Sequence, residues 1–194
     1  RPRRPVGEEV MSLSEGKSKG NYTPIPQTRL LFERYLYENA RGDTGTIPSY
    51  LKGMDLLKPM IEQDSTEFED CQDIWNVTSI ERVHELLEKV RQEQALKEQS
   101  IWYLEGKKSY LQKGFIKAAL GHYRHFLLEN HHQEKLLDLF RHHQGDPNEL
   151  ADLLNREPDL PDFLELEGKE AIRETKVRIH QGGFRKMILE SYGN

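Results

Sequence analysis

The sequence predicts an all-α protein, and three observations lead to this fold class. Apolar residues recur at three- and four-residue spacing in successive segments, most clearly in residues 106–128. Proline, glycine, serine and threonine stand where such segments would begin and end. Of the 194 residues, 36% are hydrophobic and 31% are charged, a composition typical of a polar helical protein. No apolar run approaches the roughly 18 residues that a membrane-spanning helix needs.

The sequence of the first part of the chain predicts a flexible arm followed by two helices. Residues 1–26 are basic and rich in Gly, Ser and Pro, with little to bury, so we expect a flexible basic arm. A helix should begin near residue 27 and stop at 41–43, where Arg-Gly-Asp interrupts the apolar spacing. A second helix should follow, with Thr46 as its N-cap and Pro59 as a kink.

Residues 73–77 predict a short apolar element, either a strand or a single turn. A long helix should come next, with Thr78 or Ser79 as its N-cap. Its apolar residues over 80–90 repeat at helical spacing, and its tail is polar.

The stretch 106–128 combines a wide apolar helix face with a wholly basic charge pattern. It contains no Asp or Glu, although the chain has a net charge of -5. Its bases are Lys107, Lys108, Lys113, Lys117 and Arg124. Lys113, Lys117 and Arg124 are spaced so that they should share one face of the helix. One interpretation is a surface for DNA phosphates. The alternative is a solvated face whose acidic partners lie on neighbouring elements.

These segments together predict one helical domain over residues 27–129. The composition changes after it, because acids outnumber bases in residues 130–175. Short amphipathic helices are expected there at 136–140 and 150–154, between prolines. We therefore expect 130–175 to be an acidic helical connector rather than a second core.

The last residues, 176–194, are basic again. Gly182-Gly183 should break the chain before a short amphipathic helix over 184–192. A domain should not stop on a new apolar helix, so we expect 176–194 to be the truncated start of a further domain.

The sequence shows no self-contained active site. His131-His132 and His142-His143 invite a metal interpretation, but paired histidines on a polar segment are more often solvated, so no metal ligand is assigned. The single cysteine, Cys71, excludes an internal disulfide and a cysteine-based zinc site. Neither a Walker loop nor a dinucleotide-binding loop is present.

The C-terminal sequence VRIHQGGFRKMILESYGN resembles the opening of bacterial HNH nuclease domains of restriction endonucleases. The family pattern is matched by Arg178, Gln181, Phe184, Arg185, Leu189 and Tyr192. His180 departs from it, since glycine is commoner there. The family's Cys-x-x-Thr-Gly segment, its metal-binding histidines and its general-base histidine would all lie beyond Asn194. The resemblance therefore implies no catalytic residue within this chain.

A second resemblance covers residues 47–128. The order Pro-Ser-Tyr-Leu, Asp-Ile-Trp-Asn-Val, a long helix, then Phe-Ile-Lys-Ala-Ala-Leu-Gly-His-Tyr-Arg-His-Phe-Leu is similar to a helical module that precedes nuclease domains in restriction systems. It is also similar to the core-binding domain of tyrosine recombinases, which grips DNA with helices.

These resemblances imply the DNA-binding and positioning region of an HNH restriction endonuclease in bacterial defence. The chain itself should not be an enzyme and should need no cofactor. A divalent metal would act in the downstream nuclease domain, polarising the scissile phosphate while a histidine activates water. DNA contacts are assigned to Lys107, Lys108, Lys113, Lys117, Arg124, Arg178 and Arg185.

DNA is thus the expected partner, a cytoplasmic location is the default without a membrane segment, and a homodimer is left open. One alternative function is a protein–protein interaction module of a defence system. The other is a tyrosine-recombinase-like core-binding domain.

Overall fold

The computed structural model describes residues 25–39, 45–64, 67–142, 152, 160–161 and 169–192. Within these residues every regular element is a helix and no strand occurs, so the predicted all-α class is confirmed. The described residues include no helix that is both long and apolar enough to cross a membrane. All but residues 25–26 of the predicted arm, and all but Asp152 of the helix expected at 150–154, lie outside the described residues.

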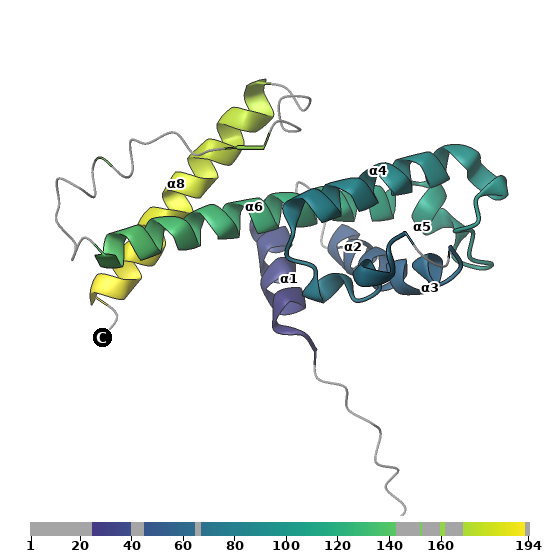
Figure 1. Cartoon of the computed structure of the whole chain (residues 1–194), viewed down its shortest axis with the longest axis horizontal. Helices are drawn as coiled ribbons and strands as arrows, with labels where there is room; N and C mark the ends of the chain where they lie inside the picture. Colours follow the sequence, from purple (N-terminus) through teal and green to yellow (C-terminus); the bar gives the residue numbers. More distant parts are fainter. Residues whose placement is uncertain are drawn as a thin grey trace, which may run out of the picture.

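The helices form a bundle around one long central helix (Figure 1). In chain order they are α1 (Gln27–Asn39), α2 (Thr46–Asp55), α3 (Leu57–Ile61), α4 (Ile80–Leu96), α5 (Lys108–Gln112), α6 (Phe115–His142) and α8 (Lys169–Tyr192). Three short 3-10 helices lie between them, η1 (Glu69–Cys71), η2 (Ile74–Asn76) and η3 (Lys97–Gln99). Helices α1, α2, α4 and α5 pack against α6, and α8 packs against its C-terminal part (Figure 1).

Two of the expected helix boundaries need correction. Thr46 was predicted to cap α2, but Gly45 is the N-cap residue and provides no side-chain hydrogen bond, so Thr46 is the first helical residue. Pro59 lacks the N–H that would bond the carbonyl of Asp55, and regular helix accordingly stops at Asp55. The helix resumes one residue later as α3, so the expected kink is a break between two helices.

Helix α4 begins where the sequence predicts. Ser79 is its N-cap, and the Ser79 hydroxyl accepts a hydrogen bond of 3.2 Å from the backbone N–H of Arg82. The Arg82 guanidinium also pairs with Asp70 at 2.7 Å and lies over the ring of Phe68. The residues before α4 are thereby fixed to its first turn. The expected short apolar element at 73–77 is a single turn, η2, and not a strand.

An aromatic cluster forms the centre of the core. Phe32 of α1 is fully buried, and its ring centroid lies 5.2 Å from that of Tyr123 and 5.6 Å from that of Phe126, both on α6. Trp75 packs edge-on against Tyr123 at 5.9 Å, and Tyr35 packs against Phe126 at 5.5 Å. Such pairs contribute about 0.5–1.5 kcal/mol beyond the burial of their area. The cluster therefore binds α1 and η2 to the same side of α6.

The hydroxyl of Tyr123 adds a directional restraint to this packing. It lies 3.2 Å from the carbonyl oxygen of Ile74 and 3.1 Å from that of Val77, and donates to the two oxygens. The carbonyl of Ile74, at the start of η2, also accepts a hydrogen bond of 3.2 Å from the backbone N–H of Val77, and Val77 itself follows the turn. A fully buried tyrosine thus supplies a polar partner for the carbonyl of Val77 and joins η2 to α6.

The predicted helix over 106–128 proves to be two helices. Gly114 has a φ of 76°, a left-handed conformation that glycine adopts at little cost, and it separates α5 from α6. Helix α6 then continues to His142. The separate helix expected at 136–140 is therefore the last part of α6, which also crosses the predicted boundary after residue 129 without interruption.

The predicted break at Gly182-Gly183 is also wrong, because α8 runs through both residues. The two glycines lie where α8 passes close to α6. A Cβ atom at Gly182 would overlap the side chain of Gln133, and one at Gly183 would lie 2.7 Å from Cδ1 of Leu136. Thr175, Ile179 and Met187 extend this buried seam along α8. The glycines therefore permit a close helix crossing instead of ending a helix.

Replacing Phe126 by alanine should lower the free energy of unfolding by about 3–5 kcal/mol, because a ring that is only 5% exposed would leave a cavity inside the aromatic cluster. Urea denaturation followed by far-ultraviolet circular dichroism measures this change. The exposed Tyr37 of α1 is the matched control, and Tyr37→Ala should change stability by less than about 0.5 kcal/mol. Equal losses from both substitutions would contradict the assigned core.

Replacing Gly183 by leucine should separate α8 from α6, because the added side chain needs the space that Leu136 occupies. Gly121 of α6 is the control, since no atom lies within 4 Å of a Cβ built there. Gly121→Ala should stabilise the helix by about 0.5–1 kcal/mol. Hydrogen exchange should become faster in residues 172–190 of the Gly183→Leu variant only. Unchanged exchange there would show that the crossing tolerates a side chain.

Candidate functional site

The residues predicted to contact DNA lie in three separate places in the structure. Lys107, Lys108, Lys113 and Lys117 are exposed and lie around α5 and the first turn of α6. We call these four residues the lysine patch. Arg124 is buried, whereas Arg178 and Arg185 lie on α8. The seven residues therefore do not form one surface.

Arg124 was predicted to share an exposed face with Lys117, and this prediction is wrong. Arg124 is only 3% exposed, and its Nη1 donates a hydrogen bond of 2.9 Å to Nδ1 of His84 on α4. Helix α4 runs antiparallel to α6 and covers this part of it. Burial, more than the nearby Arg91, lowers the pKa of Arg124 to about 10. A phosphate outside the protein cannot reach this guanidinium.

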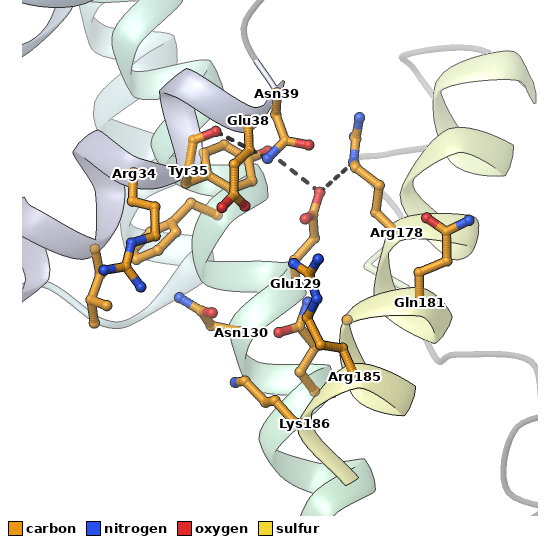
Figure 2. A pocket seen from close by; sticks show the side chains of 14 residues that line it. Arg34, Tyr35, Glu38, Asn39, Glu129, Asn130, Arg178, Gln181, Arg185 and Lys186 are labelled. Atoms are coloured by element: carbon orange, nitrogen blue, oxygen red, sulfur yellow. Dashed lines mark hydrogen bonds and ion pairs between the residues drawn. The ribbon is translucent and has the colours of Figure 1, made fainter. Parts of the chain in front are cut away.

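Arg178 and Arg185 instead line a hollow between α1, α6 and α8, with a volume of about 480 Å³. We call it the α1–α6–α8 hollow (Figure 2). Two further bases line it, Arg34 from α1 and Lys186 from α8. Glu38 and Glu129 are the acids of its lining, and Asn39, Asn130, Gln133 and Gln181 contribute amides. Among the described residues, four bases from α1 and α8 therefore surround two carboxylates.

Glu129 is the buried centre of this arrangement. It is 5% exposed, and its Oε1 accepts a hydrogen bond of 2.7 Å from Nε of Arg178 and a longer one of 3.4 Å from the hydroxyl of Tyr35 (Figure 2). Burial raises the pKa of Glu129, while Arg178 and Tyr35 oppose that rise. Burial, followed by the charge of Glu129, raises the pKa of Tyr35. This three-residue network joins α1, α6 and α8.

The pair Arg178–Glu129 leaves the other charges of the hollow unbalanced. Arg34, Arg185 and Lys186 form no ion pair within the described part of the chain. Arg34 and Arg185 are exposed, and Lys186 is partly exposed. Glu38 is the remaining acid among the described residues of the lining. The rim of the hollow thus carries a positive charge suited to an anion.

Part of this site could be predicted from the sequence. Arg178 and Arg185 match a family pattern in the sequence, whereas Arg34 and Glu129 belong to no such pattern. Glu129 could have been found, because it stands at a position of the apolar helix spacing. A carboxylate buried at such a position needs a hydrogen-bonding or charged partner. Arg34 could not have been found in this way, since nothing in the sequence places it beside α8.

The metal interpretation of the histidines gains no geometric support in the described residues, among which no group of three or more potential ligands is found. His132 is buried, with its ring centroid 5.7 Å from that of His131. Nδ1 of His142 lies 2.7 Å from the carbonyl oxygen of Asp138. His143 lies outside the described residues.

No family model matches the chain, and neither a curated protein nor a solved structure matches it.

Stability should decrease on acidification between about pH 6.5 and pH 4, because burial and the charges of Arg124 and Arg178 lower the pKa of His125 to about 4. The unfolded chain binds a proton at this position in that range, and the folded chain does not. His84 and His122, whose pKa values are also lowered, act in the same direction. Glu129, with its raised pKa, acts in the opposite direction.

Urea denaturation at pH 7, 6, 5 and 4.5 tests this dependence. Replacing His125 by glutamine should flatten the dependence of unfolding free energy on pH, by at most about 1.4 kcal/mol per pH unit for one proton. The exposed His131 provides the control, and His131→Gln should follow the wild type. Parallel curves for the His125→Gln variant and the wild type would exclude His125 as a source of the dependence.

Proposed function

We propose that this chain is a DNA-contacting helical module that positions DNA for an HNH-type nuclease domain and has no catalytic residue of its own. One observation carries the proposal: Arg178 and Arg185, from the stretch that resembles the opening of such domains, meet Arg34 and Lys186 around the α1–α6–α8 hollow. The nuclease role rests on the resemblance alone. The DNA contact has the charge arrangement as an independent support.

The overall charge explains why a local arrangement of bases is needed. A net charge of -5 repels DNA at long range, so binding depends on bases gathered at one place. Arg34, Arg185 and Lys186 come from two helices and have no ion pair to break within the described residues. Each phosphate contact releases counterions from DNA, which makes such binding strongly dependent on salt.

The lysine patch is a second surface for phosphates. In Figure 1, α5 and α8 lie towards opposite ends of the molecule, joined by α6. Lys117 and Gln133, the latter on the lining of the hollow, are separated by about 24 Å along α6 at the usual helical rise. The two basic surfaces can therefore be tested separately.

Reversing the charges of Arg185 and Lys186 together to glutamate should weaken binding to all duplexes alike. The slope of log K against log salt should become less steep by about 1.8, at about 0.9 for each lost phosphate contact. Electrophoretic shift assays over a salt series measure the slope. Lys113→Glu/Lys117→Glu is the parallel variant for the lysine patch, and Lys52→Glu/Lys58→Glu, at exposed positions on α2 and α3, is the control.

An unchanged slope in the Arg185→Glu/Lys186→Glu variant would remove the hollow from the DNA surface. A change in the Lys113→Glu/Lys117→Glu variant alone would move the contact to the lysine patch. Equal changes in these variants and in the control would show that only net charge matters, and would contradict the proposal.

A protein-docking function has one specific observation in its favour. Val177, Phe184 and Ile188 of α8 are 46%, 46% and 41% exposed and recur at seven- and four-residue spacing, on the side of α8 away from the buried seam. An apolar stripe of this kind is a usual feature of helices that bind other proteins. This function predicts weak DNA binding at 100 mM salt and no effect of the charge reversals.

A further inference from the structure

The α1–α6–α8 hollow has the form of a receptor for a single chemical group. Its volume of about 480 Å³ lies within the roughly 300–1,000 Å³ of pockets that hold one ligand. The side of a DNA duplex is convex, and phosphates follow one another along it at about 1.7 Å per charge. A hollow accommodates a group that projects from a strand better than a backbone that passes along the surface.

The charge of the lining favours a dianion. Arg178 is paired with Glu129 at 2.7 Å, which leaves Arg34, Arg185 and Lys186 against Glu38. A phosphomonoester carries about -1.5 to -2 charges near pH 7, whereas each internal phosphate of DNA carries one. The excess of bases therefore matches a phosphomonoester, the group at a phosphorylated strand end, more closely than an internal phosphate.

Glu129 also restrains Arg178. Its Nε donates to Glu129, and its two terminal nitrogens form no hydrogen bond within the described part of the chain. A guanidinium fixed through Nε keeps two parallel donors that bind phosphate oxygens as a fork. Glu129 thus acts as a positioning residue for Arg178.

Amide side chains supply the remaining polar groups of the lining. Asn39 of α1, Asn130 of α6 and Gln181 of α8 are labelled in Figure 2, and Gln133 of α6 also lines the hollow. Each amide offers both donors and an acceptor, the combination that binds the edges of nucleobases. These amides could therefore hydrogen-bond the base of a nucleotide while its phosphate is bound by the arginine and lysine side chains of the hollow.

We propose that the α1–α6–α8 hollow binds the 5′-phosphorylated terminal nucleotide of a DNA strand. This inference rests on the proposed DNA contact and names the part of the DNA that the hollow recognises. On this inference the protein recognises the ends of DNA strands through the hollow and contacts internal phosphates through the lysine patch.

Two duplexes of the same sequence test the inference, one with 5′-phosphates and the other with 5′-hydroxyls, each labelled at a 3′ end. Fluorescence anisotropy at fixed salt should show about tenfold tighter binding of the phosphorylated duplex, as expected for one additional charge-assisted interaction. The Arg34→Gln/Lys186→Gln variant should lose this preference. The Lys52→Gln/Lys58→Gln variant should keep it. Deoxyadenosine 5′-monophosphate should compete with the phosphorylated duplex, and deoxyadenosine should not.

Each other outcome identifies which proposal fails. Equal affinity for both duplexes, with binding still weakened in the Arg185→Glu/Lys186→Glu variant, would overturn strand-end recognition and leave the DNA contact in place. Binding of the monophosphate without binding of either duplex would overturn both proposals and define a nucleotide site. A preference that survives in the Arg34→Gln/Lys186→Gln variant would place end recognition outside the hollow.

Discussion

The packing of Phe32 against Tyr123 and Phe126 is the interaction on which the rest of the structure depends. These contacts hold α1 to the middle of α6, and Trp75 joins η2 to the same cluster. A long helix that is partly exposed gains little stability from its own hydrogen bonds, so α6 needs partners along its whole length. The aromatic cluster and α4 bury its first half, and α8 buries its second half. The two ends of the molecule are therefore stabilised by the same helix through unrelated contacts.

The sequence predicted the helices well because apolar spacing is a local property. It identified the fold class, the positions of α1 and α4, and a cap at Thr78 or Ser79, of which Ser79 is the one used. It failed where a distant part of the chain decides the outcome. Gly182 and Gly183 favour a break by local propensity, but the crossing with α6 gives them a packing role. Lys117 and Arg124 share a helical spacing, yet only Arg124 lies beneath α4.

The candidate site was predictable only in part for the same reason. Arg178 and Arg185 could be selected from the sequence, since they stand within one short pattern. Arg34 is far from them in the chain, and only the way α1 and α8 approach α6 brings the three together. Glu129 explains how a buried carboxylate is tolerated there. Its loss of solvation is offset by Arg178 at 2.7 Å and by the Tyr35 hydroxyl, so each of the three helices contributes one member of the network.

Assembly of the hollow therefore depends on the docking of α8. Without α8 the hollow would lose Arg178, Arg185 and Lys186 together, and Glu129 would be left as a carboxylate without its arginine. The close approach at Gly182 and Gly183 determines how near these bases lie to α1. Since the bases repel one another, the apolar seam of Ile179 and Met187 must hold them in place. An anion bound in the hollow would in turn stabilise the docked position of α8, because it would contact bases of α1 and of α8 together.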